Sequence, residues 1–330
     1  MSQEPGQRRD RELALVAGMH FLESLDQKTI AGKMNSSRST ISRMLREAIK
    51  RGIVTFTIHY PISRNTTLEG RLRSVIGYQD AWVLDTVSAD SDEQQKALGQ
   101  LGAECVAEKL PVAGSLAICW GRATRLVAEN LEGASEKRIH VIQMIGSMGT
   151  SNSKIDGIEL TKLAARRLGG TYELLNAPLV VDDAASALSL MRQSAISRVL
   201  LSAERADCAL IGLGSIAQRT SALANAGFMS ESEINQAIGL GAVGDVSGIL
   251  MDGTGRAVSS SFSSRVIGLG VERLRRIKTT IAVAYGSDKI AIIYAASLAG
   301  LVKVLVTDSE TAEKLLKLAT TGESNQEVKS

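Results

Sequence analysis

The 330-residue chain is poor in several residue types that mark specialised protein classes. It has three cysteines, four prolines and three histidines, and aromatic residues make up 3% of it. Three scattered cysteines in apolar surroundings are too few for a disulfide framework or a zinc site, so Cys105, Cys119 and Cys208 are predicted to be reduced and buried. No histidine lies at metal-ligand spacing from a second histidine or a cysteine. We therefore expect no bound metal.

Long apolar runs are also missing. No stretch reaches the roughly 18 consecutive apolar residues of a membrane span, and the charged first residues lack the apolar centre of a signal peptide. These features predict a cytoplasmic protein with no membrane contact. An apolar fraction of 44% and a charged fraction of 22% are typical of a globular protein, and the length favours two domains or one large domain with an appended module.

Charged side chains are distributed unevenly along the chain. Residues 1–60 carry 10 Lys and Arg against 6 Asp and Glu, whereas the remaining residues carry 28 against 29. The basic surplus therefore lies entirely at the front of the chain, which is where a nucleic-acid contact is best sought.

The front of the chain has the pattern of a winged helix-turn-helix. Apolar spacing predicts helices over Arg11–Glu23, Gln27–Met34 and Arg38–Lys50, with a turn at Asn35 to Ser37 and a wing strand over Ile53–Tyr60. The third helix is basic and rich in hydroxyls, as a helix in the major groove of DNA would be. Its predicted DNA contacts are Ser37, Arg38, Ser39, Thr40, Ser42, Arg43, Arg46 and Lys50. The alternative is a three-helix bundle with a solvated basic face.

The rest of the chain alternates between strands and helices. A polar connector after Pro61 predicts a domain boundary there, giving domains 1–61 and 62–330. Beyond it, strands are expected at 81–84, 115–119, 140–145, 171–174, 208–212, 245–251, 281–284 and 303–307, with helices between most of them. This order predicts a doubly wound α/β domain, with a mostly parallel sheet covered by helices on both faces.

Four strands of this domain end in glycine turns that lead into helices. The turns are Gly121 to Thr124, Gly146 to Ser151, Gly212 to Ser215 and Tyr285 to Lys289. Each turn alone is weak evidence for a ligand site. Together they are stronger, because the carboxyl ends of parallel strands converge at one edge of a sheet and glycine turns at helix starts can bind anions. Arg122, Lys289 and the Ser/Thr hydroxyls suit a phosphate with polyol hydroxyls around it. No nucleotide signature is present, and we expect no cofactor.

A further glycine-rich segment, Gly241 to Gly248, presents one carboxylate, that of Asp245. Asp245 is either a turn-forming residue or an acceptor for sugar hydroxyls. The two tryptophans, Trp82 and Trp120, are expected in the core.

Taken together, these motifs resemble the SorC family of bacterial sugar-responsive transcriptional regulators over nearly the whole chain. The resemblance rests on Ser37 to Arg43, Trp120 to Thr124, Gly241 to Gly248, Gly286 with Lys289, and Leu301 to Asp308. One departure is that Tyr285 to Asp288 stand where family members often have a glycine pair with acidic neighbours.

The resemblance implies an effector domain similar to sugar-phosphate isomerases and glucosamine-phosphate deaminases, and assembly into dimers and tetramers. It also implies that a phosphorylated sugar or related metabolite changes the affinity for operator DNA. The effector-binding residues predicted from the motifs and the resemblance are Gly121, Arg122, Ala123, Thr124, Gly146, Ser147, Met148, Gly149, Thr150, Ser151, Gly214, Asp245, Ser247 and Lys289.

The expected function is therefore a DNA-binding regulator of a carbohydrate catabolic operon and not an enzyme. The alternative is a phosphosugar isomerase or deaminase whose front bundle serves oligomerisation. Such an enzyme needs a positioned general base with a partner. Asp245 is the one good candidate, and no histidine falls in the glycine turns.

Overall fold

The computed structural model describes residues 5–54, 56, 62–85, 91–133, 138–149, 155–217 and 221–327. Its chain divides into two compact units, Met1–Tyr60 and Pro61–Ser330. Each unit has its own hydrophobic core. None of the described helices combines the length and the apolar character needed to cross a bilayer.

The first unit is built from three helices, α1 (Pro5–Phe21), α2 (Gln27–Lys33) and α3 (Arg38–Lys50). Leu13, Ile30 and Ile41, one from each helix, are fully buried at their common centre. The turn between α2 and α3 places Asn35 in the left-handed region, with φ 46°, a conformation that asparagine tolerates better than most residues. The expected wing falls largely on residues 55 and 57–60, which lie outside the described residues, and it stays a prediction.

The second unit contains a seven-stranded sheet in which every neighbouring pair is parallel. Its order is β1-β10-β9-β5-β2-β3-β4. The strands are β1 (Asp80–Leu84), β2 (Ser115–Ile118), β3 (His140–Gln143), β4 (Thr171–Glu173), β5 (Cys208–Ile211), β9 (Thr279–Val283) and β10 (Val304–Asp308). The predicted α/β class with a mostly parallel sheet is confirmed.

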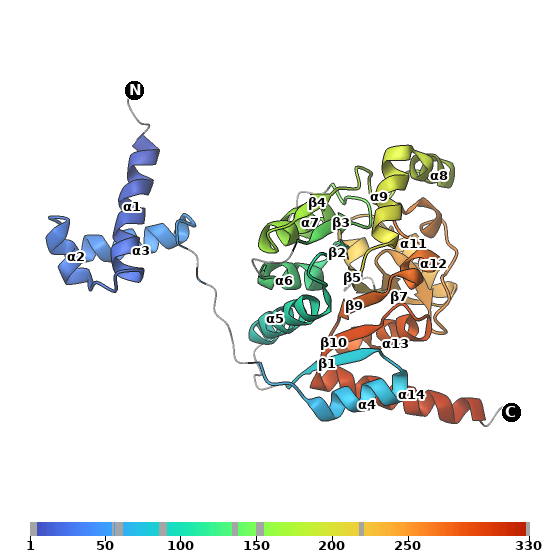
Figure 1. The fold of residues 1–330 in the computed structure, drawn as a ribbon. Coiled ribbons are helices and arrows are strands. Elements are labelled where there is room, and N and C mark those ends of the chain that lie inside the picture. The colour runs from blue at the N-terminus through green and yellow to red at the C-terminus, as the bar shows by residue number, and fades with distance from the viewer. Residues whose placement is uncertain are drawn as a thin grey trace. The chain divides into compact units, whose positions relative to one another are not determined.

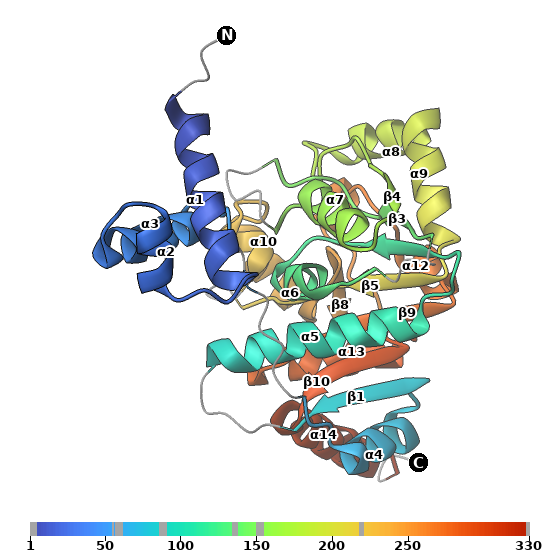
Figure 2. The same cartoon turned by 60° about the vertical axis from the view of Figure 1, so that its left-hand side comes forward.

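Helices cover both faces of this sheet. On one face, α5 (Ser91–Lys109), α6 (Arg122–Asn130) and α7 (Gly157–Arg167) pack over one apolar core, and Figures 1 and 2 show them side by side. On the other face a second core is shared by residues of α4, α8, α9, α11, α12, α13 and α14. These helices span Thr66–Ile76, Ala184–Arg192, Ser194–Glu204, Glu231–Gly239, Val271–Arg276, Ile290–Leu298 and Ser309–Glu327.

A small antiparallel sheet lies outside the main one and corrects one prediction. Its strands are β6 (Leu213–Ser215), β7 (Ala242–Val246) and β8 (Ile249–Asp252). The hairpin of β7 and β8 stands where the sequence suggested a single strand over 245–251. The chain reverses at Ser247 and Gly248, whose φ angles are 50° and 84°. Two residues with positive φ form the tight turn that joins antiparallel strands. The remaining short elements are α10 (Ala222–Asn225), η2 (Ser263–Arg265) and η3 (Ser287–Lys289).

Candidate functional site

Loops from distant parts of the sequence meet in one cavity of about 50 Å³ at the carboxyl end of the sheet. The loop after β2 supplies Trp120 to Thr124, the loop after β5 supplies Gly212 to Ser215, and the turn after β9 supplies Lys289. The walls are completed by Ala222, Asp245 and Ser247. Eight of the predicted effector-binding residues are therefore brought together here: Gly121, Arg122, Ala123, Thr124, Gly214, Asp245, Ser247 and Lys289.

The strand order explains why a site would form at this place. From β2 the chain proceeds outward to β3 and β4, whereas β5 returns to the other side of β2 and is followed outward by β9 and β10. The direction of winding thus reverses between β2 and β5. In doubly wound folds, the loops after two such strands separate and leave a crevice that commonly binds ligands.

The start of α6 forms one wall of this cavity and is suited to an anion. Gly121 is the residue before the helix, with φ 135°, and provides no side chain to cap the first backbone N–H groups. Uncapped N–H groups and the positive end of the helix dipole attract negative charge. Arg122 adds a guanidinium at the first helical position, and Thr124 is buried with its hydroxyl 3.4 Å from the Cys119 thiol.

The opposite wall carries a buried carboxylate. Strand β7 holds Asp245 beside Gly214 of β6, and Asp245 Oδ2 accepts a hydrogen bond of 2.8 Å from the backbone N–H of Gly248. Burial raises the pKa of Asp245 to about 6, although the Gly248 N–H and the charge of Lys289 oppose this shift. A carboxylate in this position can accept hydrogen bonds from ligand hydroxyls.

Lys289 supplies the matching cation. It lies at the end of η3, and its ammonium donates to the carbonyl oxygen of Leu213. Burial lowers the pKa of Lys289, and the nearby Asp245 carboxylate counteracts part of that effect. The ammonium group has three donors, so donors remain for a ligand beside the Leu213 contact.

Two buried polar atoms on residues of the wall are poorly paired. The indole Nε1 of Trp120 has no hydrogen-bond partner among the described residues, and the hydroxyl of Ser247 has only the Cys119 thiol beside it. Both residues are 6% exposed. The expectation that Trp120 and Trp82 are buried is confirmed. The sequence contained no signal that the Trp120 N–H would be left unpaired, because pairing depends on the packing around it.

The loop at Gly146 to Gly149 has a different environment. The carboxylate of Asp156 accepts hydrogen bonds from the Ser147 hydroxyl at 2.8 Å and from the backbone N–H of Met148 at 2.6 Å. An internal carboxylate thus already accepts from this loop, and Gly146 to Gly149, the described residues of the loop, do not line the 50 Å³ cavity. Thr150 and Ser151 lie outside the described residues.

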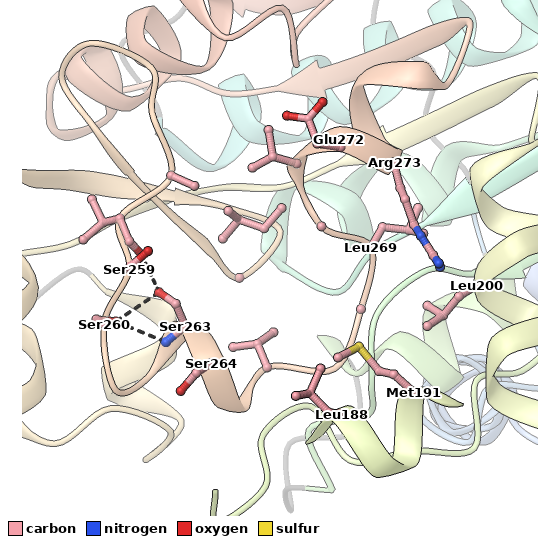
Figure 3. Close-up of a pocket in the computed structure, with 18 of the residues that line it drawn as sticks. Leu188, Met191, Leu200, Ser259, Ser260, Ser263, Ser264, Leu269, Glu272 and Arg273 are labelled. Atoms are coloured by element: carbon pink, nitrogen blue, oxygen red, sulfur yellow. Dashed lines mark hydrogen bonds between the residues drawn. The ribbon is translucent and has the colours of Figure 1, made fainter. Parts of the chain in front are cut away.

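A second cavity, of about 720 Å³, lies between α8, α9 and the segment 257–273 (Figure 3). Figure 3 shows serines gathered on one side of it and the apolar side chains of Leu188, Met191 and Leu200 on the other. Three of these serine hydroxyls form hydrogen bonds within the chain: Ser260 with Ser263, Ser263 with the Val258 carbonyl, and Ser264 with the Ser261 carbonyl. Of the predicted effector residues, none lines this cavity.

In the first unit, the predicted DNA-contacting residues lie along α3. Five of them are exposed: Arg38, Ser39, Arg43, Arg46 and Lys50. The three arginines and the lysine form no ion pair within the described part of the chain. Ser37 has a structural role, because its hydroxyl accepts a hydrogen bond from the Thr40 N–H and caps α3. Thr40 and Ser42 are half-buried.

The acidic residues near α3 form ion pairs with arginines other than the exposed ones of α3. Glu47 pairs with Arg9 at 2.6 Å and with Arg51 at 2.7 Å, and Arg51 also pairs with Asp10 at 3.0 Å. No described acidic residue of this unit therefore pairs with the four exposed cations.

Comparison with known proteins places these features in context. Residues 60–317 match the family described as "Putative sugar-binding domain". The chain is 30% identical to the sorbitol operon regulator of Klebsiella pneumoniae over 309 residues, which cover 93% of this chain and 98% of that protein. It is 29% identical over 317 residues to the transcriptional regulator LsrR of Escherichia coli K12, covering 95% and 97% of the two chains.

Solved structures of transcriptional regulators are also similar to this chain. The full-length sorbitol operon regulator SorC from Klebsiella pneumoniae matches with a TM-score of 0.71 and 29% identity, over 93% of this chain and 99% of that one. A DeoR family transcriptional regulator from Listeria monocytogenes matches with a TM-score of 0.71 and 25% identity, over 76% of this chain and 98% of that one.

Proposed function

This chain belongs to the SorC family of sugar-binding transcriptional regulators, and from that membership we propose that it regulates a carbohydrate catabolic operon in response to a metabolite. The first unit binds operator DNA through a helix-turn-helix. The second unit binds a phosphorylated sugar or a related metabolite, and this binding changes the affinity of the first unit for its operator.

One observation carries the effector part of the proposal. Eight residues predicted from the sequence motifs and the family resemblance, spread from Gly121 to Lys289, line a single cavity at the point where the strand order reverses. That is the usual ligand position in doubly wound folds.

The chemistry of the walls favours a phosphate ester with hydroxyl groups. The uncapped start of α6 and the guanidinium of Arg122 suit the phosphate, as at other helix N-termini that bind phosphate. Asp245 accepts from hydroxyls on the sugar, and Lys289 neutralises further negative charge.

The size of the cavity suggests how binding is coupled to a change of shape. A volume of about 50 Å³ holds a few water molecules, since one water needs roughly 10–15 Å³ of such space. A sugar phosphate is larger than this enclosed space, and we propose that the loops around the cavity move apart when it binds. A ligand that binds the opened arrangement better than the closed one shifts the population between them.

The DNA-binding part of the proposal rests on α3. Its exposed Arg38, Arg43, Arg46 and Lys50 lie without intramolecular ion pairs among the described residues, as cations that contact DNA phosphates or guanine edges would. We also propose that the protein acts as a homodimer or homotetramer, because paired units match the two half-sites of a typical operator.

An isomerase or deaminase is the less favoured function. Its general base would be Asp245, whose pKa near 6 suits proton transfer. However, the described residues that line the cavity include no histidine and no second carboxylate to act with it. A sugar hydroxyl acceptor needs no such partner.

The test is a thermal-shift screen of the full chain. The ligands are ribose 5-phosphate, fructose 6-phosphate and sorbitol 6-phosphate, each beside its unphosphorylated form and inorganic phosphate. A ligand at 100 times its Kd adds about 2.7 kcal/mol of stability. We expect a shift with a phosphorylated compound that is recovered unchanged. Conversion of the compound would support the enzyme, and no shift with any phosphate ester would contradict the proposed effector class.

A further inference from the structure

Two buried polar groups belong to residues that line the candidate effector cavity. The indole N–H of Trp120 has no hydrogen-bond partner among the described residues, and the hydroxyl of Ser247 has only the Cys119 thiol, a weak partner, beside it. More than nine in ten buried polar groups in proteins are paired. An unpaired indole N–H on a residue of a small cavity therefore needs an explanation.

The contrast with the other tryptophan shows that the unpaired state is specific to this position. The Trp82 indole N–H donates to Asp80 Oδ2 at 3.0 Å. The Arg64 guanidinium stacks over the Trp82 ring, with its Cζ 3.7 Å from the ring centroid. Both indoles are buried to a similar degree, with 4% and 6% of the residue exposed. Burial alone thus does not leave an indole unpaired in this chain.

The turn between β7 and β8 fixes the position of the second group. Ser247 has a φ of 50°, as the first residue of this two-residue turn requires, and a serine stands there although glycine is favoured in that region. The turn places the Ser247 hydroxyl in the same cavity wall as Asp245 and Trp120.

We propose that Trp120 and Ser247 form hydrogen bonds with oxygen atoms on the carbon chain of the effector and so determine which effector binds. This inference rests on the proposed function, since it uses the same cavity. An indole N–H can only donate, and a carboxylate can only accept. Trp120 therefore selects an acceptor oxygen, such as a hydroxyl or carbonyl oxygen, whereas Asp245 selects a donating hydroxyl.

This donor and acceptor pattern defines the class of ligand more closely. Apart from its phosphate, the compound carries one oxygen that accepts a hydrogen bond and one hydroxyl that donates. The pattern disfavours a compound with an ammonium group or a hydrogen at the position facing Trp120, because the indole N–H would stay unpaired in the complex. Sites built to bind a hydroxyl reject analogues that lack it far more strongly than apolar pockets reject a missing methylene.

The first experiment follows the indole N–H groups directly. The full chain, labelled with ¹⁵N-tryptophan, gives two indole resonances, and Trp82→Phe and Trp120→Phe assign them. Ribose 5-phosphate, fructose 6-phosphate and sorbitol 6-phosphate are then titrated into the wild-type protein. For a compound that binds, we expect the Trp120 resonance to move downfield, as a new hydrogen bond requires, and the Trp82 resonance to stay in place.

The second experiment measures the loss of discrimination. Trp120→Phe keeps an aromatic ring and removes the donor, so its affinity for the binding compound should fall about tenfold. Deoxy analogues of the binding compound, with one hydroxyl removed at a time, are then compared with the intact compound. For one of them we expect weaker binding than the intact compound to the wild-type protein, but equal binding of both compounds to Trp120→Phe. Trp82→Phe, provided that its thermal unfolding shows a folded protein, should retain the wild-type preference.

The outcomes separate this inference from the proposed function. If a phosphate ester binds while the Trp120 resonance does not move, or if Trp120→Phe binds it as tightly as the wild type, the inference is wrong and the effector site stands. If none of the phosphate esters binds, both are overturned. Should Trp120→Phe fail to fold, the resonance of the wild-type protein still decides the question.

Discussion

The carboxylate of Asp245 occupies space that exists because residue 214 is a glycine. A β-carbon at position 214 would come within 1.9 Å of Asp245 Oδ1, and the two residues face each other across the β6–β7 pair. Because any side chain at 214 would displace the carboxylate, Gly214 sets the position of Asp245 in the cavity wall.

The first prediction concerns this contact. Gly214→Ala should lower the free energy of unfolding by about 1–3 kcal/mol, the usual cost of overpacking, and should weaken effector binding because the Asp245 carboxylate moves. Denaturant unfolding and ligand titration measure the two effects. Gly239→Ala is the matched control, since nothing lies within 4 Å of a β-carbon there. Equal behaviour of the two variants would contradict the assigned role of Gly214.

The second prediction concerns pH. Burial raises the pKa of Asp245 to about 6, from an ordinary value of 3.8. Between these values the folded protein holds a proton that the unfolded chain has released, so the free energy of unfolding falls as pH rises through this window. From pH 4 to pH 7, wild-type protein should lose about 2–3 kcal/mol relative to Asp245→Asn, which lacks the titration.

Denaturant unfolding of both proteins at several pH values checks this result. Asn keeps an oxygen that can accept from the Gly248 N–H, so the variant preserves the local hydrogen bond. Parallel stability curves for the two proteins over this range would show that Asp245 does not titrate with a raised pKa.

The third prediction separates the two units. Lys289→Met keeps most of the side-chain length and removes the charge that faces Asp245. We expect it to abolish the stabilisation by a phosphate ester in the thermal-shift screen while leaving DNA affinity in the absence of effector within about twofold of wild type. Loss of both activities would mean that Lys289 supports the whole fold and not the cavity alone.

The fourth prediction concerns DNA. Arg43→Ala should weaken binding to a duplex selected from a random pool, by about 1–3 kcal/mol if Arg43 contacts a base edge. If it contacts a phosphate, the loss should be similar for all sequences and the salt dependence should decrease by about one charge. Arg71→Ala, which removes an exposed arginine from α4, is the control and should bind like wild type. Fluorescence anisotropy at several salt concentrations distinguishes these cases.

Local signals in the sequence predicted those elements whose ends are set by nearby residues. The third helix begins at Arg38 and ends at Lys50 as expected, because Ser37 caps its start and Gly52 follows its end. The hairpin of β7 and β8 was wrongly read as one strand, although Ser247 and Gly248 are a recognised turn pair. Apolar residues on both sides of that pair concealed the signal.

Interactions between distant residues could not be predicted in this way. The sequence brought Gly121 and Lys289 to one sheet edge, because carboxyl ends of parallel strands converge, whereas Asp245, on the antiparallel strand β7, was assigned to the site from its glycine-rich segment and the family resemblance. It gave no indication that Asp156 would bind the N–H groups of the loop at Met148, since a carboxylate eight residues away can point in many directions. The unpaired Trp120 indole likewise depends on side chains contributed by several loops.

The central claim is that one metabolite couples the cavity to DNA binding. The most direct test measures the Kd for the selected duplex with and without the phosphate ester that stabilises the protein, and the Kd for that ester with and without the duplex. A coupling of about 1.4 kcal/mol predicts a tenfold change in the first Kd and, by linkage, the same change in the second. A saturating effector that leaves the Kd for DNA unchanged would contradict the account.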